Sequence, residues 1–323
     1  MSARKIPGKE VRMAVKLLKF CLAAGTVLVP LAAQTPKPAQ TTPARPAPGP
    51  VQTAFDTPEA AVQALMDAVS KNDSAKLSAL FGASARQVLT SGDPQKDKAE
   101  REEFSQLASR KHELQPSTMN HDVMILTVGA EDWPFPVPLL RTNGKWRFDT
   151  DQGRIEMRAR RIGANELDAI EICAGYVEAQ QAYAAQDRDK NGMLKYAQQI
   201  MSSAGKHDGL YWEGEGSLVP VGFAEAESHS GSKPKPYHGY YFRILKSQGP
   251  NAPGGQHSYL SKDSMIGGFA LVAWPAEYGV TGIHTFIVNQ DGVVYERDFG
   301  MPASNLAAPV NRYDPDKSWV TVN

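Results

Sequence analysis

Cysteine is scarce in this sequence, with only Cys21 and Cys173 among 323 residues. Cys21 lies in an N-terminal segment that we expect to be removed, which leaves one thiol and no internal disulfide. This count excludes a zinc site of four cysteines, or of two cysteines and two histidines. Cys173 lies in a predicted long helix, where we expect it to be a small buried side chain rather than a nucleophile.

The sequence also lacks an excess of charge and a long apolar stretch in its folded part. Lys and Arg number 35 and Asp and Glu also number 35, so the net charge is +0. Nothing in this balance attracts the whole protein to nucleic acid or to an anionic membrane. After the first 33 residues no stretch is apolar enough to span a bilayer. We therefore expect no nucleic-acid partner and no stable transmembrane span.

Catalytic signatures are missing as well. The sequence contains neither an H-E-x-x-H zinc motif nor a G-x-S-x-G nucleophile elbow. This absence favours a protein that binds over one that catalyses a reaction, although it does not decide the question.

The N-terminus has the pattern of a secretion signal. Basic residues precede an apolar stretch, FCLAAGTVLVPLAA, over residues 20–33; they include Lys5, Lys9, Arg12, Lys16 and Lys19. A basic start followed by an apolar segment too short for a membrane span predicts a signal peptide over 1–33, with cleavage after Ala33. An uncleaved N-terminal anchor is the alternative. We expect an exported protein, periplasmic or extracellular.

A proline-rich stretch over residues 34–52, QTPKPAQTTPARPAPGPVQ, follows the signal. It lacks the apolar side chains that would offset the entropy of ordering it. We expect a semi-extended linker.

Residues 53–150 are expected to form a first α+β module. Thr57 before Pro58 is typical of a helix start, Asp73 or Ser74 starts a second helix that Gly82 ends, and a third covers 98–109. Strands are predicted over 121–128, 135–141 and 145–148, and Asn143-Gly144 predicts a hairpin turn.

Residues 151–300 are expected to form a second module, a long helix packed on an antiparallel sheet. The helix covers 152–185, with a break at Gly163 or Asn165, where Asn165 caps its second part. A short helix is predicted over 194–203, and strands over 237–246, 267–275, 281–289 and 293–298. Residues 301–323 are expected to be a C-terminal tail in loop conformation. The fold class is α+β.

Three sequence stretches resemble one bacterial family. They are GKHDGLYW at 205–212, HGYYFRIL at 238–245, and GGFALVA with PAEYG and GVVYE between 267 and 296. They are similar to the domain-of-unknown-function family 2950, exported bacterial proteins without an assigned activity. The resemblance covers roughly residues 55–300 and implies an exported location and a coherent fold, but no reaction.

The two modules also resemble known folds separately. Thr57-Pro58-Glu59-Ala60-Ala61 and Gly144-Lys145-Trp146-Arg147-Phe148 are similar to the first helix and last strand of the nuclear transport factor 2-like superfamily, which implies a cone-shaped fold. Residues 166–185 and the strands around 239–242 and 282–286 resemble type IV pilins and pseudopilins. No apolar pilin helix directly precedes them, so only the fold is carried over.

A dense set of aromatic residues in the second module predicts a binding surface for a cell-envelope protein or a glycan. Alternation along Tyr240, Tyr241 and Phe242 places rings on both faces of a sheet. We name five candidate binding residues there: Tyr240, Phe242, Trp212, His207 and Asp208. The Gly- and Pro-rich loop 247–256 is expected to contribute to this surface. The alternative is that the rings form core.

Asp187, Asp189 and Asn191 precede Gly192 with the spacing that opens a calcium-binding loop. The twelfth position is Gln198 rather than the bidentate glutamate, so calcium would need a ligand from elsewhere. The alternative is a polar turn in which these side chains bond the local backbone. Apart from calcium, no cofactor is predicted.

Taken together, these features predict an exported, non-enzymatic binding or envelope-associated protein. One alternative is a pseudopilin-like structural subunit. Another is a small-molecule enzyme with a pocket in the first module, using polar groups such as His112, His121 and Asp132.

Overall fold

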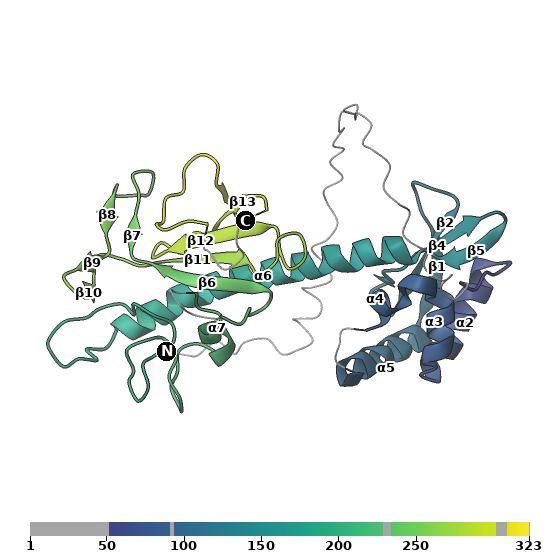
Figure 1. Ribbon diagram of the computed structural model, residues 1–323, viewed down its shortest axis with the longest axis horizontal. Helices are drawn as coiled ribbons and strands as arrows, with labels where there is room; N and C mark the ends of the chain where they lie inside the picture. The colour runs from purple at the N-terminus through teal and green to yellow at the C-terminus, as the bar shows by residue number, and fades with distance from the viewer. Residues whose placement is uncertain (1–51, 91–93, 229–233, 302–308, 323) are drawn as a thin grey trace, which may run out of the picture. The chain divides into compact units, whose positions relative to one another are not determined.

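The computed structural model describes residues 52–90, 94–228, 234–301 and 309–322, which fall into two compact units (Figure 1). Unit 1 is Met1–Met157 and unit 2 is Arg158–Asn323, so their boundary lies within helix α6, Thr150–Ala184. Helices and antiparallel sheets occur in both units, which confirms the α+β class. The predicted signal peptide and all of the linker except Gln52 lie outside the described residues.

The helices of unit 1 begin where the sequence predicts them. The Thr57 hydroxyl accepts a hydrogen bond from Ala60 N at 3.2 Å, and the Asp73 carboxylate accepts one from Lys76 N at 3.0 Å. These bonds satisfy backbone N–H groups that the first helical turn leaves free. The helices are α2 (Pro58–Ser70), α3 (Ser74–Phe81), the 3₁₀-helix η1 (Gly82–Ser84), α4 (Ala85–Leu89) and α5 (Pro94–Arg110).

The sheet of unit 1 is antiparallel with the order β1-β2-β4-β5, and β3 pairs with β2. Its strands are β1 (His112–Pro116), β2 (Val123–Val128), β3 (Trp133–Pro134), β4 (Leu139–Thr142) and β5 (Lys145–Phe148). The predicted turn between β4 and β5 is confirmed: Asn143 and Gly144 have φ of 54° and 74°, the left-handed conformation that a tight hairpin requires.

Phenyl rings fill the space between the helices and the sheet of unit 1. The ring of Phe81 on α3 lies 5.1 Å from that of Phe148 on β5, and the ring of Phe104 on α5 lies 5.2 Å from that of Phe135. Phe81 and Phe148 are 3% and 1% exposed. An apolar core therefore occupies the place where the cone-like alternative would put a polar pocket.

Helix α6 is continuous from Thr150 to Ala184, so the predicted break at Gly163 or Asn165 is wrong. The Asp149 carboxylate accepts a hydrogen bond from Gln152 N at 3.1 Å and so caps its start. The Asn165 side chain does not cap a helix, because it donates to Thr281 O at 2.8 Å. Among the described residues, no helix has both the length and the apolar composition needed to cross a membrane.

The main sheet of unit 2 is antiparallel with the order β14-β13-β12-β11-β6. Figure 1 labels its strands β6, β11, β12 and β13. Its strands are β6 (Tyr240–Leu245), β11 (Ala270–Pro275), β12 (His284–Asn289), β13 (Tyr295–Asp298) and β14 (Val320–Thr321). Two short ribbons pair β7 (Ser247–Gln248) with β8 (His257–Ser258) and β9 (Leu260–Ser261) with β10 (Ser264–Met265), and a short helix α7 covers Val221–Glu225.

The C-terminal part of α6 packs against this sheet. The Tyr176 hydroxyl donates to Ala270 O on β11 at 3.2 Å, and the Tyr176 ring meets that of Phe269 edge to face at 5.6 Å. Cys173 is fully buried in the same layer, and burial raises the pKa of its thiol to about 12. This protonated thiol has the inert, small-hydrophobe environment that the sequence predicts.

Residues 194–203 form no helix, which corrects the prediction made for them. The Gln180 amide on α6 accepts from Ala197 N at 2.8 Å and donates to Ala197 O at 2.9 Å. Tyr196 forms a bridge to Met265, and Met201 a bridge to Tyr211. Hydrogen bonds to distant parts of the chain therefore take the place of the hydrogen bonds between neighbouring turns of a helix.

The C-terminal segment is part of unit 2 rather than a tail. Tyr313 and Trp319 are 1% and 8% exposed, and Val320 and Thr321 form the edge strand β14. Tyr313 N donates to Ser247 O at 3.0 Å. The predicted end of the second module at residue 300 is therefore too early.

Candidate functional site

An open groove of about 440 Å³ lies in unit 2 where the C-terminal segment meets β13, and we call it the C-terminal groove. Aromatic rings, two guanidinium groups and two carboxylates share its lining: Arg297, Phe299, Val310, Asn311, Arg312, Asp314, Asp316 and Trp319. A concave surface with apolar and polar groups side by side has the general character of a binding site.

Strand pairing positions the aromatic part of the C-terminal groove. β14 pairs with β13 through Glu296↔Val320 and Tyr295↔Thr321, which brings Trp319 next to the end of β13. The rings of Phe299 and Trp319 meet edge to face at 5.6 Å. Phe299 keeps 39% of its surface exposed, so its ring is available to a ligand.

The charged groups of the groove differ in their partners. The guanidinium of Arg297 lies 4.4 Å from the centre of the Phe299 ring and forms no ion pair with any described residue. Arg312 is 3.4 Å from the carboxylate of Asp314. Hydrogen bonds from Ser318, and to a smaller extent the charge of Arg297, outweigh burial and lower the pKa of Asp316. This lowered pKa keeps the Asp316 carboxylate ionised at neutral pH.

The loop 247–256 is held in place by its own side chains. Gln248 is 1% exposed and its amide donates to Pro253 O at 2.6 Å and Gly255 O at 2.8 Å. Asn251 N donates to Asp314 at 2.8 Å, which ties the loop to the groove. A Cβ on Gly249 would lie 2.2 Å from the Asp314 carboxyl carbon, so only glycine fits there.

Two of the predicted binding residues are buried, which corrects their assignment to a surface. Tyr240 and Phe242 are both 0% exposed. The Phe242 ring packs against Phe223 of α7 at 4.9 Å, and the Tyr240 hydroxyl donates to His284 O at 3.0 Å. A Cβ on Gly282 would lie 2.1 Å from that hydroxyl oxygen. These rings therefore belong to the core and present no area to a partner.

Trp212 is also unavailable, because its indole is covered by neighbouring side chains. The imidazole of His207 stacks on it at 4.5 Å with an interplanar angle of 21°, and the guanidinium of Arg188 lies 5.0 Å from its centre. The same guanidinium lies 4.5 Å from the ring of Tyr183. Trp212 is 7% exposed. The stack fixes the loop around residue 207 on the end of α6.

His207 and Asp208 do not form an acid–base pair. The Asp208 carboxylate accepts hydrogen bonds from Ser203 N at 2.7 Å and from the Gln199 amide at 3.0 Å. These bonds outweigh burial and lower the pKa of Asp208. Asp208 thus stabilises its own turn, while His207 stacks on Trp212, so the contacts of both residues are structural.

Asp187, Asp189 and Asn191 have the contacts of a polar turn. The Asp187 carboxylate accepts from Gly192 N at 2.7 Å and Asn191 N at 3.2 Å, and the first of these bonds is the main reason that the pKa of Asp187 is lowered. Asp189 pairs with Lys195. Among the described residues, no three His, Cys, Asp or Glu side chains gather as a metal site. Of the two interpretations of this motif, the geometry favours the turn.

We expect calcium to leave the melting temperature unchanged, because the Asp187 oxygens already bind backbone N–H groups. A calcium site with a dissociation constant a hundredfold below the added concentration would stabilise the protein by about 2.7 kcal/mol. Thermal melts with calcium and with chelator measure the difference. A clear upward shift with calcium that disappears in Asp189→Asn would show that the calcium interpretation is right.

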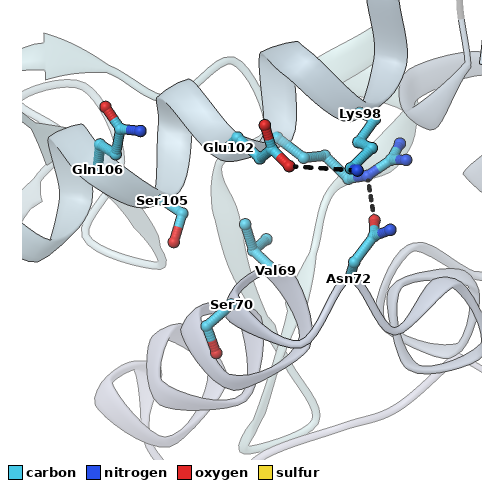
Figure 2. Close-up of a pocket in the computed structure, with 8 residues that line it drawn as sticks. Val69, Ser70, Asn72, Lys98, Glu102, Ser105 and Gln106 are labelled. Carbon is cyan, nitrogen blue, oxygen red and sulfur yellow. Dashed lines mark hydrogen bonds and ion pairs between the residues drawn. The ribbon is translucent and has the colours of Figure 1, made fainter. Parts of the chain in front are cut away.

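Unit 1 has a smaller groove of about 250 Å³ between α2 and α5 (Figure 2). Its polar groups pair with one another: Arg101 Nε donates to the Asn72 side chain at 2.8 Å, and Lys98 Nζ lies 3.7 Å from Glu102. All of its lining residues come from α2, the turn after it and α5: Val69, Ser70, Asn72, Lys98, Arg101, Glu102, Ser105 and Gln106.

The three polar residues of the enzyme alternative do not line this groove. Asp132 pairs with Lys111 at 2.6 Å, His112 Nδ1 lies 2.8 Å from Ala108 O, and His121 is exposed. The groove therefore contains none of the three residues that the alternative would use for proton transfer, and its one carboxylate, Glu102, pairs with Lys98.

Sequence reasoning missed a cluster on α6 that joins the helix to the segments leading into β6 and β12, formed by Asn165, Glu166 and Asp168. We call it the α6 clamp. Glu166 Oε1 accepts from Ile283 N at 2.8 Å, His284 N at 2.9 Å and His284 Nδ1 at 3.3 Å. Asp168 lies 2.7 Å from His238 Nδ1. Glu166 and Asp168 are two positions apart on α6, whereas their partners His284 and His238 are 46 positions apart in the sequence (284 − 238). No local pattern therefore revealed the pairing.

The Glu166–His284 pair shifts both of its members toward their charged forms. Burial alone would raise the pKa of Glu166, but hydrogen bonds from the His284 ring and from the backbone of His284 and Ile283 lower it overall. The hydrogen bond to Glu166 raises the pKa of His284 above its usual 6.5, against the opposing effect of burial.

A family model of proteins of unknown function, DUF2950, matches residues 52–322. The match extends beyond the predicted 55–300 and takes in the C-terminal segment that completes the sheet and the groove. No curated protein and no solved structure matches the chain. With most of its length matched, this chain belongs to the DUF2950 family of proteins of unknown function.

Proposed function

We propose that this chain is an exported binding protein, and that its C-terminal groove contacts a partner outside the cytoplasm without transforming it. The observation that carries the proposal is the groove itself, where the exposed Phe299 and the unpaired Arg297 lie together on a rigid sheet edge. Exposed aromatic and arginine side chains are the groups that dominate binding energy in protein interfaces.

The exported location rests on the basic and apolar leader over residues 1–33. Cys21 lies within this leader, and the remaining cysteine, Cys173, is buried and needs no reducing environment. A periplasmic or extracellular location suits such a chain.

The non-enzymatic character rests on the contacts of the polar residues. His207 stacks on an indole, Asp208 and Asp187 cap turns, and Glu166 holds backbone N–H groups. Each of these groups has a stabilising role in unit 2, and none of them lines the C-terminal groove.

The finer fold resemblances are part of the same proposal. A long helix against an antiparallel sheet in unit 2 supports a pilin-like arrangement, and helices over an antiparallel sheet in unit 1 support a cone like that of the nuclear transport factor 2-like superfamily. A pseudopilin-like subunit would form oligomers, so a monomer at every concentration in size-exclusion chromatography would contradict that alternative.

Photo-crosslinking in intact cells tests the proposed function. A photoreactive phenylalanine analogue at position 299 is expected to give a discrete crosslinked product, whereas the same analogue at position 119 gives none. Met119 is 93% exposed in unit 1 and controls for random collision. We expect the product in the exported fraction, on a chain that lacks residues 1–33.

Two results would contradict the proposal. One is equal crosslinking from positions 299 and 119. The other is recovery of the chain from the cytoplasm with its leader intact.

A further inference from the structure

At the edge of the unit 2 sheet, beside the C-terminal groove, the last strand β14 is shorter than β13, the strand it pairs with. β14 pairs only with Tyr295 and Glu296, although β13 continues to Asp298. Ser318 N donates to Asp316 Oδ1 at 2.8 Å and Trp319 N to Asp316 O at 3.0 Å, so the chain turns before it reaches Arg297. β14 is itself the last strand in the sheet order. Such an edge accepts an added strand through main-chain hydrogen bonds.

Apolar side chains stand on this edge. Val320 on β14 is 61% exposed, and Phe299 just after β13 is 39% exposed. Side chains of an extended peptide alternate between the two faces of a sheet, so a strand added here can place apolar side chains against Val320 and Phe299. The edge fits an extended chain better than a compact molecule.

Arg297 supplies a positive charge at the same place. Arg297 has no ion pair among the described residues, and its guanidinium carbon lies 4.4 Å from the centre of the Phe299 ring. The nearby carboxylates have other partners: Asp298 accepts from the Tyr278 hydroxyl at 3.1 Å and Asp314 pairs with Arg312. Asp316 accepts from Ser318 N at 2.8 Å, although it also lies close enough to Arg297 for that charge to lower its pKa. A planar, oriented guanidinium recognises a carboxylate in two-point geometry.

We propose that the C-terminal groove binds an extended peptide segment that carries a carboxylate. The peptide backbone lies along the free edge of β13 and β14, and the carboxylate pairs with Arg297. This inference rests on the proposed function and names the class of its partner. It favours an acidic peptide over the other expected partner, a glycan, because a glycan would make no use of a strand edge.

Fluorescence anisotropy with two labelled peptides tests the inference on the full-length mature protein. One peptide alternates valine with aspartate, and the other alternates valine with lysine. We expect the aspartate peptide to bind and the lysine peptide to fail. Binding should weaken as salt is added, because the groove is open to solvent.

Arg297→Gln is expected to weaken binding of the aspartate peptide by about tenfold, the loss that one charge-assisted hydrogen bond represents. Arg297→Lys is expected to fall between it and the parent protein, since it keeps the charge but not the planar fork. Arg110→Gln is the matched control, because Arg110 is an exposed arginine in unit 1. Circular dichroism verifies that each variant is folded.

Equal affinity for the two peptides, or an unchanged affinity in Arg297→Gln, would overturn the inference. So would failure of both peptides to bind at millimolar concentration. If position 299 nonetheless crosslinks to a partner in cells, the groove is a binding site for another class of ligand, and only the proposed function survives. If the aspartate peptide binds while no partner is found in cells, the groove binds acidic peptides and only the proposed function fails.

Discussion

Phe242→Ala is expected to lower the free energy of unfolding of unit 2 by about 3–5 kcal/mol, the usual cost of removing a buried phenyl ring. The Phe242 side chain is 0% exposed and packs against Phe223, and its backbone bonds to Ala226 O and Ser228 N. Strand β6 pairs with β11 on one side, and Phe242 forms a bridge to Glu227. The strand therefore cannot move to close the cavity that the missing ring leaves. Urea denaturation followed by tryptophan fluorescence measures the change, and the two units are fitted as separate transitions.

Phe299→Ala makes the matched comparison, because it is the same substitution on an exposed ring. Phe299 keeps 39% of its surface exposed, so we expect a loss below about 1 kcal/mol. The two variants should also differ in binding: Phe299→Ala weakens partner binding in a folded protein, whereas Phe242→Ala acts by unfolding. If Phe242→Ala is as stable as the parent and loses binding, our assignment of that ring to the core is wrong.

Glu166→Ala is expected to lower the free energy of unfolding by about 2–4 kcal/mol at pH 6. One carboxylate oxygen accepts from Ile283 N, His284 N and the His284 ring, so its removal leaves two backbone N–H groups at the start of β12 without their partner. Glu166→Gln keeps the side-chain length and should lose less. Glu171→Gln, on an exposed position of the same helix, is the control and should lose almost nothing.

The loss caused by Glu166→Gln should depend on pH with a maximum. The folded pKa of Glu166 is lowered, so its stabilisation is present above its ordinary value of 4.5 and is lost as the pH falls through the folded pKa. The folded pKa of His284 is raised, so its stabilisation is complete below 6.5 and is lost as the pH rises through the folded pKa. The difference between parent and variant should therefore be largest between about pH 4.5 and 6.5.

Urea denaturation of both proteins from pH 3 to pH 9 measures this profile. A difference in stability that stays flat across the range would mean that the pair is not ionic. Asp168→Asn provides an independent comparison, because it changes the contact with His238 and leaves Glu166 intact.

Elements defined by neighbouring residues were predicted well. Thr57 with Pro58 and Asp73 mark helix starts, Gly82 ends α3, and Asn143-Gly144 turns the hairpin. In each case the deciding bond or dihedral angle lies within a few residues, so the sequence contains the whole cause.

Elements stabilised by distant partners were predicted poorly. β1 alternates little and is mostly exposed, and it is a strand because β2 pairs with it along its whole length. Residues 194–203 have helix-forming composition, but the Gln180 amide binds Ala197 and prevents a helix there. Asparagine is a common helix-capping residue, but the Asn165 amide donates a hydrogen bond to Thr281 O instead.

The residues named from the sequence as a binding surface lie in the same unit as the C-terminal groove, but none of them lines it. Alternation along β6 places Tyr240 and Phe242 on one face, which the structure bears out, but α6 and α7 cover that face. Arg297 and Trp319 gave no local signal, because their meeting depends on β14 returning to pair with β13. A periodic pattern tells which residues share a face, whereas the packing of other elements decides which face remains open.

The amino-acid sequence alone determined the α+β class, the helix caps, the tight turns and membership of the family, since each of these depends on short-range geometry or on the order of residues. Tertiary structure decided that the predicted aromatic surface is core, that the Asp187 motif is a turn, and that the C-terminal segment completes a sheet and forms a groove. The physical reason is that burial and hydrogen-bond partners are properties of residues brought together from distant positions, and no window of sequence contains both members of such a pair.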